Sequence, residues 1–301
     1  MKKLPVKLGF TYDLRQDYLN AGYSEEETAE FDSEDTIEGI AGALERLGYE
    51  VDRIGGVNSL IKRLEAGARW DLVFNICEGL YGPCREAQVP VLLDIYRIPH
   101  VFSGGLELAV TLDKGITKHI IRDHGLATAA FKVIRSLDDL HEISLTYPLF
   151  VKPIGEGTGK GIGPDSKVND YEMLRRVCQH QLTLYRQPVL IEEFLPGREI
   201  TVGILGSGTE ARVPGMMEVQ FMPHESSSIY SYENKANYTQ FVHYSLVEEP
   251  LYKECEDLAL KAWMALGCKD AGRVDLRCDK NGVPCFMEVN PLAGLNPEHS
   301  D

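Results

Sequence analysis

The stretch that most constrains the fold is AGRVDLRCDKNGVPCFMEVNPLAG, from Ala271 to Gly294. It predicts two strands joined by a two-residue turn at Asn281-Gly282, because Asn-Gly between alternating apolar residues is the strongest short-range hairpin signal. Side chains alternate faces along a strand, so this register separates polar from apolar residues. The polar face pairs Asp275 with Glu288 and Arg273 with Asn290. The apolar face sets Val274, Leu276 and Cys278 against Val289, Met287 and Cys285.

The polar face of this hairpin is a candidate metal site. Two carboxylates directly opposite each other repel, so a cation is expected between them. Asp275, Glu288 and the amide oxygen of Asn290 are hard oxygen donors that suit Mg²⁺, with water and substrate phosphates completing its coordination. Taken alone, the hairpin fits equally well with a solvated outer face that needs no ligand.

Length and charge limit the possible partners. The chain has 301 residues, 44% of them hydrophobic, so two or three compact units are expected. A formal net charge of −15 argues against nucleic acid or an anionic membrane as a partner, since both need clustered Lys and Arg. Seven cysteines without a CxxC pair indicate neither a disulfide framework nor a zinc site. Without a signal peptide or a membrane-length apolar run, we expect a soluble cytoplasmic protein.

Strands and helices alternate along the first hundred residues. Strands are expected at 6–11, 49–54, 71–76 and 100–102, and helices at 36–47, 58–66 and 85–96. This order predicts an α/β fold with a parallel sheet, whose ligands bind beyond the carboxyl ends of the strands. The loop 78–82 directly follows the third strand and is a candidate site loop, with an ordinary connection as the alternative.

A glycine-rich loop follows a strand that carries a lysine. The strand Leu149–Pro153 contains Lys152 and leads into Ile154–Gly163, which has five glycines. Backbone N–H groups of such a loop can converge on phosphate oxygens while Lys152 adds positive charge. The spacing is neither GxxxxGK[ST] nor GxGxxG, so neither motif is present. A glycine loop without a ligand is the alternative.

Three further segments carry candidate residues. An expected helix at 106–124 carries Lys114, which alone would more often be a solvated lysine. The apolar strand within Pro188–Gly197 turns acidic and could bind adenine through its backbone, leaving Glu199 for ribose hydroxyls; an amphipathic strand and turn is the alternative. The polar, tyrosine-rich loop 226–244 has the length of a lid, or else is a surface turn.

Several separate motifs occur in a fixed order along the chain. They are LDKGITK, FVKP with its glycine loop, IEEFLPGREITVGILG, YSYENK, and GRVDL followed by MEVNPLAG. In this order they resemble the ATP-grasp enzymes and, among these, the D-alanine–D-alanine ligase family. The resemblance covers most of the chain from about Asp71 onward.

The resemblance implies a division of the chain. Residues 1–105 would form a Rossmann-like, parallel-sheet substrate domain. Residues 106–187 would form the central ATP-grasp lobe with the glycine-rich loop. Residues 188–301 would form the C-terminal lobe with the lid loop and the metal site, and the two lobes would have mixed and antiparallel sheets.

The resemblance also implies roles for individual residues. The ATP-binding residues would be Lys114 and Lys152 at the phosphates, Glu156, Gly157 and Gly159 in the closing loop, Glu192, Glu193 and Leu195 at the adenine hinge, Glu199 at the ribose, and Lys235 in the lid. The ligands of two Mg²⁺ ions, or of Mn²⁺ in their place, would be Asp275, Glu288 and Asn290. The tetrahedral oxyanion of the ligase reaction would be stabilised by Arg273 and the backbone N–H near Gly294.

The chain departs from the family in the part that binds amino acids. Relatives use an N-terminal glutamate, a glycine-loop serine, a lid tyrosine and an HGxxGEDG loop. The comparable positions here are Tyr12-Asp13-Leu14, Thr158, Ala236 and residues 78–86, so only the hydroxyl of Thr158 is retained. The sequence therefore predicts a retained ATP half and a rebuilt amino-acid half.

The resulting hypothesis is an ADP-forming carboxylate–amine ligase of the D-alanine–D-alanine ligase type, acting in peptidoglycan biosynthesis on small amino acids. The alternatives are a ligase for another amino acid or amine in specialised metabolism, and a nucleotide-binding protein without turnover. The family further implies a homodimer. Relatives usually continue with a helical segment after the metal motif, whereas this sequence ends at Asp301, which fits a C-terminally truncated form.

Overall fold

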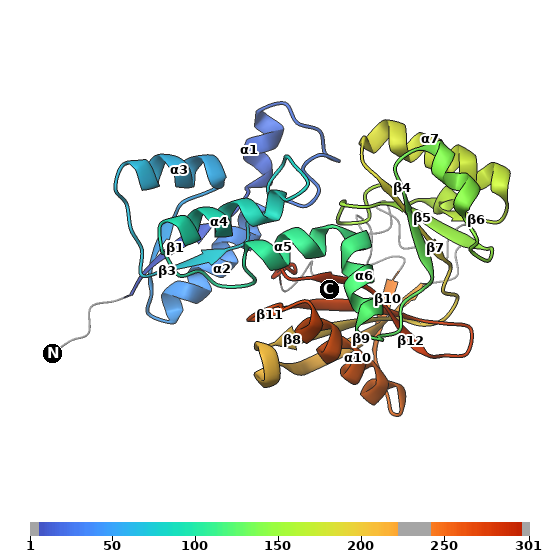
Figure 1. The fold of residues 1–301 in the computed structure, drawn as a ribbon. Helices are drawn as coiled ribbons and strands as arrows, with labels where there is room; N and C mark the ends of the chain where they lie inside the picture. Colours follow the sequence, from blue (N-terminus) through green and yellow to red (C-terminus); the bar gives the residue numbers. More distant parts are fainter. Residues whose placement is uncertain (1–5, 222–241, 297–301) are drawn as a thin grey trace. The chain divides into compact units, whose positions relative to one another are not determined.

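A computed structural model of the chain describes residues 6–221 and 242–296 (Figure 1). The chain forms two compact units: unit 1 contains 1–109, 268–272 and 291–301, and unit 2 contains 110–267 and 273–290. One sheet is parallel and two contain antiparallel pairs, which confirms the expected α/β class. The division into three domains stays a prediction. Among the residues described, no helix combines the length and apolar character that a membrane crossing requires.

Unit 1 contains a three-stranded parallel sheet in the order β2-β1-β3. Its strands are β1 (Lys7–Thr11), β2 (Glu50–Arg53) and β3 (Leu72–Asn75). Its helices are α1 (Arg15–Asn20), α2 (Glu34–Arg46), α3 (Val57–Glu65), the 3₁₀ turn η1 (Arg85–Ala87), α4 (Gln88–Ile95) and the first part of α5 (Gly105–Leu112). Helix α2 packs with Leu8 and Phe10 of β1, whereas α3 and α4 pack with Val73 of β3. The sheet is therefore covered on both faces.

Helix α2 shows why the periodic segments of unit 1 form where the sequence predicts them. Ile37, Ala41 and Leu44 recur at helical spacing and are all buried. The side chain of Ser33 accepts a hydrogen bond from the backbone N–H of Thr36 and so caps the first turn. Burial of one apolar stripe and an N-terminal cap together fix this helix.

Two expected elements near the end of unit 1 were wrong. The fourth strand at 100–102 is reduced to a single bridge between Val73 and His100, because Phe102 adopts a left-handed conformation (φ 75°) that turns the chain away. The single helix expected at 106–124 is two helices, α5 and α6 (Lys114–Asp123). Asp113 separates them, since its extended backbone and its side chain, which accepts a hydrogen bond from the N–H of Ile116, make it the N-cap of α6.

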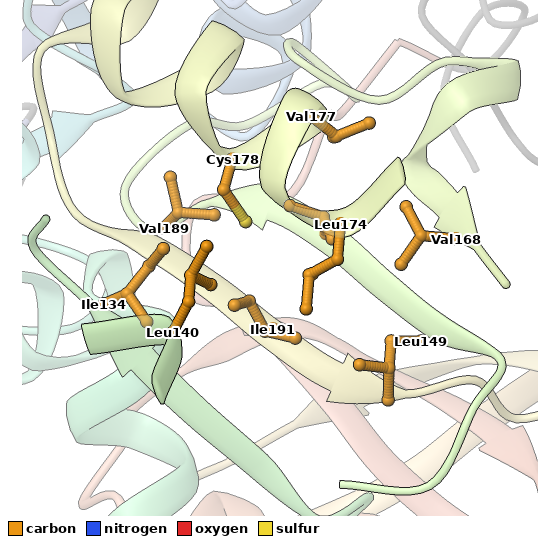
Figure 2. Packing of buried hydrophobic residues seen from close by; sticks show 10 residues of the cluster. Ile134, Leu140, Leu149, Val168, Leu174, Val177, Cys178, Val189 and Ile191 are labelled. Atoms are coloured by element: carbon orange, nitrogen blue, oxygen red, sulfur yellow. The ribbon is translucent and has the colours of Figure 1, made fainter. Parts of the chain in front are cut away.

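The first sheet of unit 2 has the order β4-β7-β5-β6. Its elements are β4 (Phe131–Ile134), η2 (Leu137–Glu142), β5 (Leu149–Pro153), η3 (Pro164–Ser166), β6 (Lys167–Val168), α7 (Tyr171–Tyr185) and β7 (Val189–Glu193). Figure 2 shows Val189 and Ile191 of β7 beside Leu174 and Cys178 of α7, within one buried apolar cluster. Because side chains alternate along β7 and β5, their remaining residues point to the opposite face of the sheet.

The second sheet of unit 2 has the order β10-β9-β8-β11-β12. Its elements are β8 (Glu199–Leu205), η4 (Gly208–Glu210), β9 (Arg212–Phe221), β10 (Val242–Leu246), α10 (Leu251–Ala265), β11 (Ala271–Cys278) and β12 (Pro284–Asn290). Helix α10 buries Trp263 completely, and the Trp263 indole donates a hydrogen bond to the carbonyl of Gly206.

The hairpin β11–β12 has the predicted pairs at one end and a different register at the other. Asp275 pairs with Glu288 and Arg273 with Asn290, but Leu276 pairs with Phe286 instead of Met287. Met287 is the extra residue of a β-bulge. The two-residue turn was also wrong, because the turn spans 279–283, with the N–H of Asp279 donating to the carbonyl of Val283. The longer turn and the bulge compensate each other.

Phe286 consequently takes the buried place that was predicted for Met287. Phe286 is fully buried and lies opposite Leu276, whereas Cys285 lies opposite Arg277. Gly282 accounts for the longer turn, since its φ of 84° lies in the left-handed region that glycine adopts without a steric penalty.

Candidate functional site

Two lysines and one glutamate form a buried ionic cluster in unit 2. Lys118 Nζ lies 2.8 Å from Glu192 Oε2, and Lys152 Nζ lies 2.9 Å from Glu192 Oε1. The exposed fractions of Lys118, Lys152 and Glu192 are only 0%, 2% and 5%. Lys152 and Glu192 belong to the face of the first sheet opposite to the one that packs with α7, and Lys118 reaches them from α6. Helix α6 can approach this sheet closely because Gly115, which lacks a side chain, leaves room beside Val133 of β4.

Charge compensation keeps this cluster ionised. Burial alone would raise the pKa of Glu192, but Lys118 and Lys152 outweigh burial and lower it to about 2. Burial lowers the pKa of Lys118 against the attraction of Glu192. For Lys152, the attraction of Glu192 and of more distant carboxylates overcomes burial, so its pKa is raised. Three charges of +1, −1 and +1 leave a net positive charge on this face.

Lys114 begins α6 and lies near both the glycine loop and the hairpin. Its Nζ donates a hydrogen bond to the backbone carbonyl of Glu156 at 2.6 Å and lies 3.7 Å from Glu288 Oε2. The carboxylate of Glu156 forms an ion pair with Lys160 at 3.0 Å and accepts a hydrogen bond from Gln187 at 2.7 Å. The side chain of Glu156 therefore fixes the loop, while its carbonyl group holds the Lys114 ammonium.

The glycine loop contains consecutive left-handed residues. Thr158 and Gly159 have φ angles of 52° and 74°, and Gly161 follows with 76°. A left-handed backbone is costly for a β-branched threonine. At Gly161 an added Cβ would lie 2.4 Å from a Pro153 carbon, so glycine is required there. The loop is thus a folded turn in which Thr158 has an unusual conformation.

The segment after β7 has a charged and aromatic environment. Two cations lie over the ring of Phe194. The Lys167 ammonium is 4.0 Å from the ring centroid, and the Arg277 guanidinium is 5.1 Å from it. Arg277 Nη1 forms an ion pair with Glu199 Oε2 at 3.0 Å. Glu193 is directed differently from Glu192, since its Oε1 accepts a hydrogen bond from the N–H of Thr146.

Asp275 is the centre of the polar face of the hairpin. Its carboxylate accepts hydrogen bonds from Arg273 Nε at 2.9 Å, from Thr201 Oγ1 at 3.0 Å and from Asn290 Nδ2 at 2.9 Å. Glu288 lies directly across the strand pair from it. The structure therefore brings together the four polar hairpin residues of the sequence prediction.

The donor set of this face fits a divalent cation. It offers two carboxylates and an amide oxygen, which are hard ligands, with water and phosphate oxygens as the natural remaining ligands of Mg²⁺. The described part of the chain contains no group of three or more His, Cys, Asp or Glu side chains that could hold a metal ion. Asp275 and Glu288 would consequently need such additional oxygen ligands.

Most predicted site residues belong to unit 2. Those found on the faces just described, on the glycine loop or on the segment after β7 are Lys114, Lys152, Glu156, Gly157, Thr158, Gly159, Glu192, Glu193, Leu195, Glu199, Arg273, Asp275, Glu288 and Asn290. Gly294 follows β12 in unit 1, and Lys235 and Ala236 lie outside the described residues. Their assigned roles stay predictions.

Sequence reasoning missed several residues that hold the predicted ones in place. They are Lys118 beside Glu192, Gln187 beside Glu156, Thr201 beside Asp275 and Arg277 beside Glu199. Only Lys118 had a sequence signal that could have revealed its burial. It follows Lys114 by one helical turn, and the same helix has another buried position at Ile121. The other contacts join distant segments.

Carboxylates gather where β1 and β3 of unit 1 end. Asp13 is almost fully buried and accepts hydrogen bonds from Tyr18 Oη at 2.6 Å and from the N–H of Gly79 at 2.9 Å. Burial, with Asp13 nearby, raises the pKa of Asp32 to about 7. Burial and neighbouring carboxylates also raise the pKa of Glu78 well above its ordinary value. The expected site loop 78–82 therefore lies beside a cluster of buried carboxyl groups that hold their protons more tightly than exposed ones.

One arginine partly compensates this charge. Arg85 Nη2 contacts both carboxylate oxygens of Glu30, at 3.0 and 3.1 Å, and both side chains are more than nine-tenths buried. Arg85 lies in η1, near the end of the segment 78–86 that replaces the HGxxGEDG motif. In place of the HGxxGEDG motif of its relatives, unit 1 thus has a buried ion pair between Arg85 and Glu30.

Comparisons with known proteins identify the family. A family model described as "D-ala D-ala ligase C-terminus" matches residues 120–300. A D-alanine–D-alanine ligase of Bordetella petrii is 32% identical over 234 residues, which cover 76% of this chain and 69% of that protein. The chain belongs to the D-alanine–D-alanine ligase family.

Solved structures of the D-alanine–D-alanine ligase family share the fold. The ligase of Bacillus anthracis complexed with ATP has a TM-score of 0.72 at 22% identity, covering 99% of this chain and 89% of that one. The VanG D-Ala:D-Ser ligase of Enterococcus faecalis has a TM-score of 0.73 at 18% identity, covering 99% and 93%. These likenesses confirm the ATP-grasp fold that the motif order predicts.

Proposed function

We propose that this protein is an ATP-dependent, ADP-forming carboxylate–amine ligase that makes a dipeptide through an acyl-phosphate intermediate. The observation that carries the proposal is the polar face of the hairpin, where Arg273, Asp275 and Glu288 have the predicted register. The lysines on the neighbouring elements of the same unit support it, because Lys114 Nζ lies 3.7 Å from Glu288. As the family implies, the proposal includes small amino acids as substrates and a cytoplasmic homodimer.

The chemistry requires charge neutralisation more than covalent help. A carboxylate is a poor electrophile, so ATP phosphorylates it and leaves as ADP, and an amine then displaces inorganic phosphate from the acyl phosphate to give the amide. Phosphoryl transfer depends on positioning and on electrostatic stabilisation of phosphate oxygens. In this proposal, Lys114 and Lys152 bind phosphate oxygens and the glycine loop covers them.

The hairpin residues would act on the reacting groups. Asp275, Glu288 and Asn290 would hold two Mg²⁺ ions, which supply Lewis-acid neutralisation of the phosphates when bound. Arg273 would stabilise the oxyanion that develops as the amine attacks, together with the backbone N–H near Gly294. Thr158 would place its hydroxyl at the first amino acid. Exclusion of water would protect the acyl phosphate from hydrolysis.

A second candidate is a ligase for a different amino acid or amine. The carboxyl groups of Asp13, Asp32 and Glu78 favour it, because the ammonium group of a substrate amine would stabilise the ionised form of such a buried cluster. In both candidates the nucleotide chemistry is the same.

The deciding experiment is an ADP-release assay with single amino acids, amino-acid pairs and amines. Turnover with D-alanine alone supports the first candidate, and turnover only with another amine supports the second. A Glu288→Gln variant serves as the inactive control. ATP binding without ADP release for any substrate would contradict both candidates.

A further inference from the structure

Lys118 is held by contacts within unit 2. Its Nζ donates hydrogen bonds to Thr128 Oγ1 at 2.7 Å and to the Phe286 carbonyl at 3.4 Å, and it forms an ion pair with Glu192 Oε2 at 2.8 Å. Its side chain is completely buried. Lys118 therefore cannot be one of the lysines that contact phosphate.

The two lysines proposed to contact phosphate differ from Lys118 in this respect. Among the described residues, the ammonium of Lys152 has a close contact with Glu192 Oε1 only. Lys114 donates to the Glu156 carbonyl, with Glu288 farther away at 3.7 Å. Lys114 and Lys152 each retain N–H groups that can donate to an incoming phosphate, so the three lysines divide into one that is completely enclosed and two that are available.

We propose that Lys118 is a positioning residue that orients Lys152 for the nucleotide through the shared carboxylate of Glu192. This inference rests on the ligase function proposed above. Thr128 and the Phe286 carbonyl hold the Lys118 ammonium independently of Glu192, since the Thr128 hydroxyl itself donates to the same carbonyl at 2.8 Å. Lys118 then fixes one oxygen of Glu192, and the other oxygen fixes Lys152.

Electrostatics explains why a second lysine is needed. If Lys152 were the only partner of Glu192, the pair would be neutral, and the ammonium could be drawn onto both carboxylate oxygens. Lys118 occupies one of these oxygens and gives the cluster its net positive charge. A phosphate oxygen is consequently attracted to Lys152 without competing against a full counter-charge.

The test is direct ATP binding to the full chain, measured by calorimetric titration together with a urea unfolding curve. Lys118→Met should weaken ATP binding at least about tenfold, the scale of one lost charged hydrogen bond. The KM for amino-acid substrates should change less than twofold. Lys132→Met is the matched control, because Lys132 is an exposed lysine of β4 that pairs with the exposed Glu142. It should bind ATP as the wild type does.

A double-mutant cycle keeps the proposal falsifiable if Lys118→Met alone folds poorly. Lys118→Met/Glu192→Gln removes both charges together, a change that buried pairs tolerate better than loss of one partner. If the two residues act through one chain of contacts, the double variant should bind ATP about as weakly as Glu192→Gln alone. If the losses of ATP affinity in the two single variants multiply in the double variant, the proposal is overturned.

Other outcomes separate this inference from the proposed function. A folded Lys118→Met protein with wild-type ATP affinity and merely lower stability would show a structural role and overturn the inference alone. Failure of the wild-type chain to bind ATP would contradict the proposed function itself.

Discussion

Glu192 in unit 2 and Asp32 in unit 1 are both withdrawn from water, yet their acidities are opposite. Two lysines hold Glu192 ionised and lower its pKa to about 2. Asp32 has another carboxylate nearby, and its pKa is raised to about 7. Burial acts in the same direction on both groups, so the sign of the nearest charges decides the result.

This difference separates the two halves of the proposed ligase. Unit 2 places two lysines next to Glu192, and this cluster keeps a net positive charge, which suits the proposed binding of phosphates. Unit 1 concentrates carboxylates at the strand ends with Arg85 as a partial counter-charge. The retained motifs contain a glutamate that is paired with lysines. The rebuilt loop lies beside carboxyl groups whose charge Arg85 compensates only in part.

Glu288→Gln should give the largest effect and tests the nucleotide half. Removing one of two opposed carboxylates should reduce ADP release by about 10³-fold or more, because phosphate charge would lose its cation. The circular-dichroism spectrum and the unfolding midpoint should stay close to wild type. Near-normal ADP release would contradict the metal assignment.

Asp32→Asn should stabilise the protein at alkaline pH. Because the folded-state pKa of about 7 lies above the ordinary 3.8, the ionised group penalises the folded state above pH 7, and the penalty fades as pH falls toward 4. The free energy of unfolding of the variant should exceed that of the wild type by about 4 kcal/mol at pH 8 and by under about 2 kcal/mol at pH 5. Urea unfolding at both pH values measures this, and a pH-independent difference would contradict it.

Glu192 should show the opposite pH response. Its lowered pKa stabilises the folded state above pH 4.5, and the stabilisation is lost as pH falls toward 2. The free energy of unfolding that separates wild type from Glu192→Gln should shrink by about 2 kcal/mol between pH 7 and pH 3. Parallel denaturant curves for the two proteins provide the measurement. A constant separation would mean that Glu192 is not an ionised partner of the lysines.

Lys132→Met should have the smallest effect. Lys132 and Glu142 form an exposed ion pair at 3.0 Å on the same sheet that carries the buried cluster. Exposed pairs contribute at most about 1 kcal/mol, and salt screens them. The unfolding free energy should change within that range, and its difference from the wild type should shrink as salt is added. A larger loss would remove the contrast between buried and exposed pairs.

The sequence predicted the regular elements well because their signals are local. The stripe that forms α2 and the apolar strand that forms β7 need only neighbouring residues to be recognised. The opposition of Asp275 to Glu288 was also predictable, since it follows from alternation along two short strands. Motif order supplied the rest of the candidate site.

Other features depend on contacts that no local pattern reports. The pairing of Lys118 with Glu192 joins α6 to β7, and that of Arg277 with Glu199 joins β11 to β8. The break before α6 depends on one capping side chain, that of Asp113, within an otherwise continuous helical pattern. The carboxylates of unit 1 were not placed because residues 13–35 have weak periodicity.

The bulge at Met287 divides the hairpin into two independently registered ladders. Deleting Met287 would remove the bulge, and because Phe286 and Glu288 would then be neighbours that point to opposite faces, Glu288 would stay opposite Asp275 in a continuous ladder. Residues inserted into the loop at 279–283 would be accommodated at the tip, because the cross-strand pairs on both sides of the bulge fix the register of the strands. The end of the hairpin that carries Asp275 and Glu288 should therefore tolerate insertions at the tip, which makes the loop 279–283 a practical place to attach a reporter.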